Sequence, residues 1–323
     1  MQKRPLGRTG IRIAPLVLGG NVFGWTADAR TSFALLDRFI AGGLDTIDTA
    51  EMYSAWVPGH QGGESEAIIG DWMASRGCRD AVTIMTKVGA PLDGGRTGLS
   101  RERIVAACEG SLKRLRTDRI DVYFSHYPDA ATPEEESLRA YESLVADGKV
   151  RAIGCSNYDA AQLRHALDVA SDRGLPRYEV VQPEYNLYTR TKYEGPLRDL
   201  CVAETLGVVV YYSLAAGFLT GKYRSAADFG QSPRGGNMKK YLDDRGLALL
   251  DALDGVASRH GATPAEVALA WLIQRDGVTA PIASATSAKQ LMELAGFASI
   301  ELDGGAVAKL DAASAGGSPP PGW

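Results

Sequence analysis

Residues 44–53 read LDTIDTAEMY: a short apolar run ends in the carboxylate of Asp48, and Tyr53 follows five residues later. Two later stretches have the same form. Residues 81–87 (AVTIMTK) end in Lys87, and residues 120–126 (IDVYFSH) end in His126. A short apolar run that stops at a polar residue is typical of a buried strand entering a loop. Three successive strands of this kind deliver Asp48, Lys87 and His126 to one end of a sheet, with Tyr53 just beyond the first.

The rest of the chain repeats this alternation of strand-like and helix-like segments. Eight strands are expected, at 15–19, 44–48, 81–87, 120–126, 150–154, 180–182, 208–212 and 279–283. Segments with helical periodicity separate them, and two start at expected capping boxes, Thr132 to Glu135 and Thr263 to Glu266. The pattern predicts a (β/α)8 TIM barrel over 1–323 as a single domain, with a short N-terminal β-hairpin in residues 3–13 and long loops on the C-terminal face, above all 213–241.

An open, doubly wound sheet is the competing architecture, because it also needs parallel strands and crossover helices. Its usual Gly-x-Gly-x-x-Gly turn after the first strand is missing, since residues 19–24 (GGNVFG) have glycines at the wrong spacing. The barrel also explains why polar residues stand at successive strand ends, which converge on one mouth. The sequence therefore favours the barrel.

Composition excludes several classes of function. The net charge is −4, from 35 Lys and Arg against 39 Asp and Glu, so no basic field indicates nucleic acid or an anionic membrane. No apolar run approaches the roughly 20 residues that span a bilayer, and the first residues lack the apolar core of a signal peptide. The four cysteines are scattered without metal-ligand spacing, which predicts reduced thiols, no metal site and a cytoplasmic protein.

Tyr, Lys, Asp and His at one mouth suit a particular chemistry. A phenol titrates near 10, and a neighbouring ammonium favours its anion, while a buried carboxylate keeps that ammonium charged. An imidazole can orient a carbonyl oxygen or relay a proton. We therefore expect a device that protonates an oxygen anion as hydride reaches a carbonyl carbon, with the hydride supplied by a cofactor.

These residues resemble the signature of the aldo-keto reductase superfamily: Asp48-Thr49-Ala50-x-x-Tyr53, Lys87 at the next strand end, and His126 to Asp129. Residues 154–157 (GCSN), Gln182, residues 212–222 (YSLAAGFLTGK) and residues 284–293 resemble its later motifs. The resemblance implies a (β/α)8 barrel that binds NADPH, with NADH as the alternative, and reduces a small carbonyl compound or sugar. It implies Tyr53 as the general acid, Lys87 and Asp48 lowering its pKa, and His126 orienting the carbonyl.

The resemblance also implies a cofactor site. Its members are Gly20, Asn21, Asp48, Ser156, Asn157, Gln182, Tyr212, Ser213, Leu214, Ala216, Gly217, Lys222, Arg234, Thr286, Gln290 and Glu293. Ser156, Asn157 and Gln182 would hold the nicotinamide carboxamide, Tyr212 would stack on the ring, and the loop to Lys222 would bind the pyrophosphate. Plain core packing remains the alternative for Tyr212, and a helix cap remains one for Gln290.

The chain departs from the family pattern in four places. Ser213-Leu214 is one residue shorter than the usual Ser-Pro-Leu, and Asn21 stands where tryptophan is common. Gln290 and Leu294 replace a common arginine and asparagine at the 2′-phosphate, a charge that Arg234 or Lys289 would have to supply. Residues 54–63 form an insertion beside Tyr53. Trp25, Trp56 and Tyr127 are the expected substrate-lining residues.

Two further functions stay open beside the reductase. The resemblance to channel-associated β subunits of this superfamily allows a cofactor-binding sensor with little turnover. An enzyme is favoured because the tetrad, Asp48, Tyr53, Lys87 and His126, is intact. A barrel lyase or epimerase is the third alternative, and the expected nicotinamide site disfavours it. The substrate, its direction of conversion and the oligomeric state do not follow from the sequence.

Overall fold

The computed structural model describes residues 2–320 and shows a closed barrel of eight parallel strands. The strands run in the order β10-β3-β4-β5-β6-β7-β8-β9. Their bounds are β3 Val17–Gly19, β4 Thr46–Asp48, β5 Thr83–Val88, β6 Ile120–Ser125, β7 Val150–Ser156, β8 Val180–Gln182, β9 Gly207–Val210 and β10 Ala280–Ala283. The predicted TIM barrel is confirmed, and so is the hairpin, whose strands β1 (Arg4–Pro5) and β2 (Arg12–Ile13) pair antiparallel.

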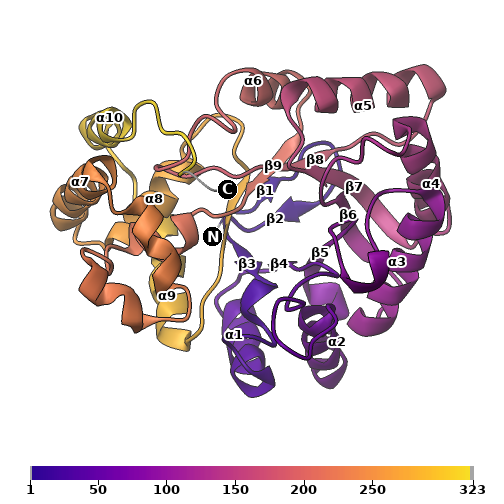
Figure 1. Cartoon of the computed structure of the whole chain (residues 1–323), viewed down its shortest axis with the longest axis horizontal. Helices are drawn as coiled ribbons and strands as arrows, with labels where there is room; N and C mark the ends of the chain where they lie inside the picture. The colour runs from indigo at the N-terminus through magenta and orange to yellow at the C-terminus, as the bar shows by residue number, and fades with distance from the viewer. Residues whose placement is uncertain (1, 321–323) are drawn as a thin grey trace.

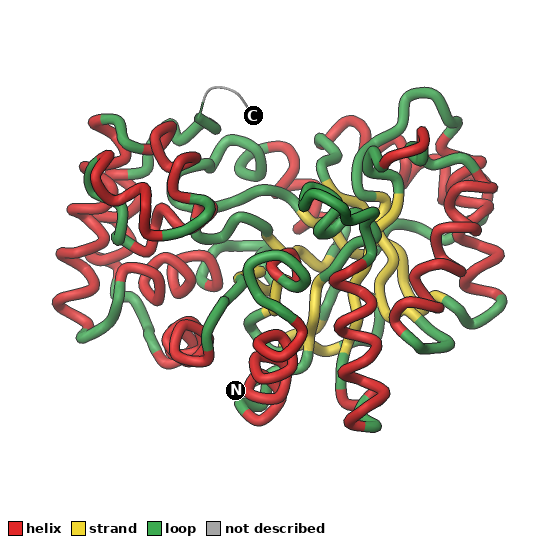
Figure 2. Tube along the Cα trace, turned by 60° about the horizontal axis from the view of Figure 1, so that its bottom comes forward, coloured by secondary structure: helices red, strands yellow, loops and turns green. Residues whose placement is uncertain are grey.

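Helices alternate with the strands around the outside. In Figure 1, α1 to α6 follow one another round the barrel, and α7 to α10 gather on the remaining side. Figure 2 shows the same arrangement as red helices around yellow strands. Their bounds are α1 Ala29–Ala41, α2 Glu64–Arg76, α3 Arg101–Leu115, α4 Glu134–Ala146, α5 Ala160–Arg173, α6 Pro196–Ala203, α7 Asp244–His260, α8 Pro264–Ile273, α9 Ala288–Gly296 and α10 Gly304–Ala313.

One of the two expected capping boxes forms. Thr263 and Glu266 satisfy each other's backbone N–H groups at the start of α8. The box expected at Thr132 is wrong, because α4 starts one residue later, from Pro133, without a side-chain cap. The Thr132 hydroxyl instead donates to the Asp129 carboxylate at 2.7 Å, a nearby acceptor that competes with the helix end.

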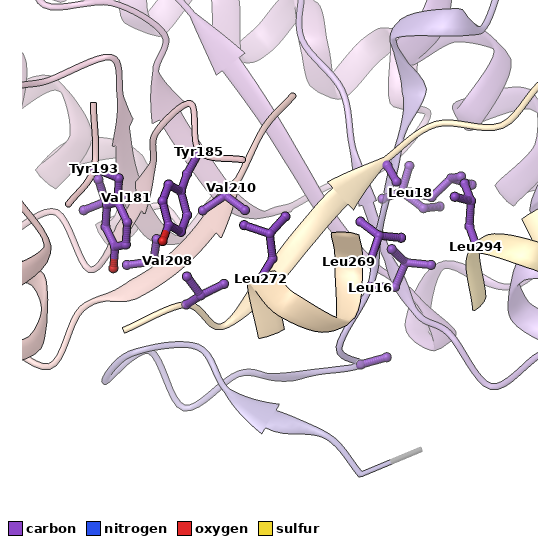
Figure 3. Close-up of a cluster of buried hydrophobic side chains, with 14 of the residues drawn as sticks. Leu16, Leu18, Val181, Tyr185, Tyr193, Val208, Val210, Leu269, Leu272 and Leu294 are labelled. Atoms are coloured by element: carbon purple, nitrogen blue, oxygen red, sulfur yellow. The ribbon is translucent and has the colours of Figure 1, made fainter. Parts of the chain in front are cut away.

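Side chains of the strands alternate between two cores. Outward-facing residues of the strands pack against the helices; Figure 3 shows Leu16 and Val210 near Leu269 and Leu272 of α8. Inward-facing apolar residues form a second cluster inside the barrel, namely Val17, Met85, Val122, Phe124, Val180, Val209, Ala280 and Ile282, together with Leu6, Ile11 and Ile13 of the N-terminal segment. The hairpin therefore closes the foot of the barrel.

The opposite end of the barrel carries the long connections. Between β9 and α7 the chain makes three 3-10 segments, Ala215–Thr220, Ala226–Gln231 and Gly235–Tyr241. The tail after α10 returns to this end, where the Gly317 carbonyl accepts hydrogen bonds from the backbone N–H groups of Arg190 and Thr191. Within residues 2–320, none of the helices has the length and apolar character to cross a membrane.

Candidate active site

The alternation of side chains along the strands decides which residues line the bottom of the barrel mouth. Met85, Phe124 and Val180 point into the barrel. Two residues further along each strand, on the same face, come Lys87, His126 and Gln182. The alternation of the strands therefore places Lys87, His126 and Gln182 on the inner surface of the barrel, directly above a layer of apolar side chains.

Lys87 is the centre of the predicted tetrad. Its ammonium is fully buried and donates to both oxygens of Asp48, at 2.7 and 2.8 Å, and to the Thr49 carbonyl at 2.6 Å. It also lies 3.1 Å from the hydroxyl of Tyr53, which donates to Asp48 Oδ2 at 3.1 Å. Gln182 Nε2 donates to Asp48 Oδ1 at 2.9 Å, so the carboxylate is held on three sides. The Thr49 carbonyl is a backbone partner of Lys87, which a motif of side chains could not predict.

The electrostatics of Tyr53 differ from the expectation. Burial raises the pKa of Tyr53 well above its ordinary value, and the charge of Asp48 raises it further. Burial also lowers the pKa of Lys87, against the opposing attraction of Asp48. The pKa of Tyr53 is therefore raised and not lowered in the protein by itself, and Asp48 acts in the direction opposite to the expected one, whereas the lowering by Lys87 stays a prediction. Tyr53 holds its proton until a stronger base develops beside it.

His126 lies across the mouth from Tyr53, with ring centroids 6.4 Å apart. Burial, and then the charge of Lys87, hold the pKa of His126 well below its ordinary value, so the ring is neutral. Its Nδ1 is buried without a hydrogen-bond partner in the structure. A neutral imidazole with a free nitrogen is suited to contact a bound polar group such as a carbonyl oxygen.

The three predicted substrate-lining residues form an aromatic wall around this pair. Trp56 packs edge-on against Tyr53 at 6.1 Å, and Trp25 packs on Trp56 at 5.7 Å. Tyr127 stacks on His126 at 5.0 Å. Trp56 and Tyr127 are each 43% exposed although they are large and apolar, as ligand-contacting aromatics are.

Residues at the ends of β7 and β8 adjoin the tetrad. The Ser156 hydroxyl donates to the Gln182 carbonyl at 2.8 Å, and Asn157 Nδ2 donates to the His126 carbonyl at 2.9 Å. Tyr211 donates to Asn157 Oδ1 at 2.7 Å. Sequence reasoning missed this partner, although strand alternation from Val209 would have pointed it inward.

The segment after β9 holds the next group of predicted residues. Tyr212 packs beside Tyr211 at 5.2 Å, and its φ is +51°. Ala216 and Gly217 also have positive φ, +57° and +107°, and a Cβ added at Gly217 would meet open space. Ser213 turns inward instead, donating to the Val210 carbonyl at 2.9 Å. Leu214 packs against the apolar core, whereas Lys222 is exposed. The Gly217 N–H already donates to the Leu214 carbonyl at 2.9 Å, so what the turn offers to a ligand is the open space beside Gly217.

Another group connects the ends of β3 and β10. The Ser284 hydroxyl donates to Asn21 Oδ1 at 2.6 Å, and the Gly20 carbonyl accepts from Ser65 at 2.8 Å. A Cβ on Gly20 would collide with that serine and the Asp48 carbonyl, which explains the glycine.

The residues predicted for the adenosine end interact with one another. Gln290 Oε1 accepts from the Thr286 N–H at 2.9 Å and from its hydroxyl at 3.0 Å. Ser287 caps α9 by accepting from the Gln290 N–H. Glu293 lies 3.8 Å from the exposed Lys289. This group contacts none of the tetrad residues through a hydrogen bond, and the helix start beside it can receive a phosphate.

Arg234 lies apart from the residues predicted for the adenosine end. Its guanidinium carbon is 5.0 Å from the centroid of Trp25, and it interacts electrostatically with Tyr53 and Tyr212. These contacts place it at the reaction end of the site. The role at the 2′-phosphate stays a prediction that the contacts do not favour.

The described residues include no cluster of three or more His, Cys, Asp or Glu that could hold a metal ion. Cys108, Cys155 and Cys201 are buried free thiols, and Cys78 is partly buried.

The barrel and the tetrad at its mouth together indicate the class of protein to which the chain belongs. The sequence model of the aldo/keto reductase family matches residues 15–315, and the chain belongs to this family of oxidoreductases. Similar proteins include an uncharacterized oxidoreductase, YrpG, of Bacillus subtilis, 36% identical over 94% of this chain and 93% of that protein. A probable voltage-gated potassium channel subunit beta of rice is also 36% identical, over 91% and 90%. The protein tas of Escherichia coli is 29% identical over 97% of both chains.

Proposed function

We propose that the protein is an NAD(P)H-dependent reductase of an aldehyde, ketone or sugar carbonyl, with Tyr53 as proton donor. The observation that carries the proposal is the position of the Tyr53 hydroxyl, 3.1 Å from both Lys87 Nζ and Asp48 Oδ2. A phenol between an ammonium and a carboxylate at an open mouth is arranged for proton transfer. The same three residues could be a structural ion pair under the rim, but a structural pair has no need of the half-buried tyrosine.

The chain's own residues account for the proton side of the reaction. His126 is neutral and can donate to the substrate oxygen, turning that oxygen toward Tyr53. As negative charge develops there, Tyr53 releases its proton, and Lys87 stabilises the phenolate. Asp48 keeps Lys87 charged and fixed, and the protein regains its proton from solvent.

A nicotinamide cofactor, when bound, supplies the hydride. The residues present fit such a group. Gln182 and Asn157 place amides beside the tetrad, Tyr212 offers a ring, and the turn at Ala216 and Gly217 is open to a phosphate. NADPH is the proposed cofactor. NADH remains the alternative because α9 has the uncharged Gln290 at the position where a cation would bind the 2′-phosphate of NADPH.

A sensor role is the second candidate, and one observation favours it. A relative at 36% identity carries the name of a potassium channel subunit beta. A sensor would bind the cofactor tightly and turn over negligibly.

The test compares Tyr53→Phe with the wild type in cofactor binding and in reduction of 4-nitrobenzaldehyde. We expect the variant to bind NADPH as before and to lose about 10²- to 10⁴-fold in kcat, the usual contribution of a general acid. Tyr123→Phe is the matched control, because the buried hydroxyl of Tyr123 has no hydrogen-bond partner within residues 2–320 and lies outside the site. Equal activity of Tyr53→Phe and the wild type would refute the assignment, and wild-type binding without turnover would support the sensor.

A further inference from the structure

The first turn of α2 adjoins the strand ends that carry the tetrad. Ser65, the second residue of this helix, is fully buried. Its hydroxyl donates to the carbonyl of Gly20, the residue after β3, at 2.8 Å. It also lies 2.9 Å from the hydroxyl of Thr49, the residue after β4. Since β3 and β4 are neighbours in the barrel, Ser65 connects the ends of two adjacent strands.

The direction of these two bonds follows from the number of hydrogens. A hydroxyl has one hydrogen to donate and can accept two hydrogen bonds, whereas a carbonyl oxygen only accepts. The hydrogen of Ser65 therefore points at Gly20, and the Thr49 hydroxyl is the donor in its contact with Ser65. Thr49 is itself fully buried, and a buried hydroxyl that loses its partner is costly. The bond to Ser65 thus holds Thr49 in one orientation.

The orientation of Thr49 matters because its backbone carbonyl is a partner of Lys87. An ammonium has three hydrogens, yet four oxygen atoms lie within hydrogen-bond distance of Lys87 Nζ. They belong to the Asp48 carboxylate, the Thr49 carbonyl and the Tyr53 hydroxyl. The Thr49 carbonyl is the nearest, at 2.6 Å, and the Tyr53 hydroxyl is the farthest, at 3.1 Å. The position of the Thr49 carbonyl therefore affects which hydrogen of the ammonium is left for Tyr53.

The next residue of the helix holds the strand that carries Lys87. Glu66 is fully buried, and its Oε1 accepts at 2.5 Å from the hydroxyl of Thr86, which precedes Lys87 in β5. Arg114 of α3 donates to Glu66 Oε2 at 2.7 Å. Both oxygens are bound, which is the condition for burying a carboxylate. Ser65 and Glu66 together fix the first turn of α2 against three successive strands of the barrel.

We propose that Ser65 is a positioning residue for the proton transfer. Through the Thr49 hydroxyl it fixes the backbone carbonyl beside Lys87, and so the direction in which the ammonium presents its hydrogens to Tyr53. The proposal rests on the reductase function above. A displacement of about 1 Å, even from a change far from the chemistry, can cost about 10²-fold in rate. A bond that fixes one acceptor of Lys87 therefore acts on kcat without touching a ligand.

The test removes one hydroxyl at a time. Ser65→Ala leaves the Thr49 hydroxyl without its acceptor, Thr49→Val removes that hydroxyl at nearly constant shape, and Thr49→Ser keeps it. With 4-nitrobenzaldehyde, kcat should fall about 10-fold in Ser65→Ala and in Thr49→Val, the rate equivalent of one hydrogen bond. KM and the dissociation constant of NADPH should not change, and Thr49→Ser should stay near the wild type. The double variant should be no slower than either single one, because both changes break the same bond.

A solvent isotope effect distinguishes positioning from a general loss of stability. Heavy water should lower kcat more in Ser65→Ala than in the wild type, because proton transfer from Tyr53 becomes the slower step. Ser137→Ala is the matched control, since Ser137 is buried in the first turn of α4 and donates to the Leu99 carbonyl at 2.8 Å. It should leave kcat and the isotope effect unchanged. An equal loss of kcat in both alanine variants would overturn the proposal.

Two binding and spectroscopic measurements complete the test. Weaker NADPH binding in Ser65→Ala, with wild-type kcat in Thr49→Val, would show that Ser65 acts through Gly20 on the cofactor and would overturn the proposal. The NMR signal of the Lys87 ammonium, identified by its loss in Lys87→Met, should shift in Ser65→Ala and not in Ser137→Ala. If it shifts although the wild type reduces no carbonyl compound, the positioning of Lys87 stands and the reductase function fails. An unchanged signal together with unchanged kcat would refute the role of Ser65.

Discussion

Replacing Lys87 by methionine tests the electrostatic core of the site. Lys87 is fully buried, and its ammonium lies within hydrogen-bond distance of four oxygen atoms, two of them on Asp48. Without it the Asp48 carboxylate, 2% exposed, would keep the donors of Gln182 and Tyr53 from among the described residues. Removing one partner of a buried ion pair costs about 3–5 kcal/mol of unfolding free energy, because the other charge remains buried.

The same substitution should remove catalysis. An ammonium 3.1 Å from an oxygen anion stabilises it by about 5 kcal/mol at an effective dielectric constant of about 20. Losing that stabilisation in Lys87→Met corresponds to a fall in kcat of roughly 10³- to 10⁴-fold. Urea unfolding and NADPH oxidation measure the two losses separately.

A second variant makes the reasoning refutable. Asp48→Asn combined with Lys87→Met removes both charges, so most of the lost unfolding free energy should return while kcat stays far below that of the wild type. The control Lys149→Met breaks an exposed pair with Glu109 and should not move the urea midpoint. A double variant no more stable than Lys87→Met alone would show that the buried charge is not the cause.

Two further predictions concern pH and packing. Since the pKa of His126 is lowered in the folded protein, the unfolded chain takes up this proton first as the pH falls below about 6.5. Stability from this residue is therefore present above that pH and lost below it, and His126→Gln should show a shallower loss of unfolding free energy between about pH 6.5 and 5; equal slopes would contradict this. Gly70→Ala should cost about 1–3 kcal/mol in urea unfolding, because its Cβ would collide with the backbone of Arg114 and Leu115 where α2 meets α3. Gly110→Ala in α3, which meets only the flexible end of a side chain, is its control, and equal unfolding of the two variants would argue against this close approach.

The barrel could be predicted from the sequence because its strands are short apolar runs that each end at a polar residue, such as Asp48, Lys87 and His126. The same reading brought Asp48, Lys87 and His126 together, since parallel strands end on one face of a barrel. The prediction from the sequence failed for the pKa of Tyr53, where burial decides the direction of the shift. The pKa of Tyr53 moves upward because of desolvation and then the charge of Asp48, and no spacing in the sequence reports desolvation.

Other features depended on contacts between segments distant in the sequence. Thr132 has the spacing of a helix cap, yet Asp129 takes its hydroxyl. Arg234 lies in a segment of 3-10 turns, where no periodicity fixes direction, and its contact with Trp25 spans more than 200 residues. Local patterns therefore predicted the strand ends, and long-range packing decided the partners of the loops.

The hairpin at the foot of the barrel has a practical consequence. Leu6, Ile11 and Ile13 fill the interior there, so the tetrad faces the opposite mouth. A label or solid support joined ahead of Arg4 would face away from that opening. One joined beyond Ser318 would emerge close to the loop of Arg190 and Thr191, which borders the mouth. Immobilisation through the amino end is thus the orientation that leaves the protein free to exchange its ligands, for instance on a sensor chip.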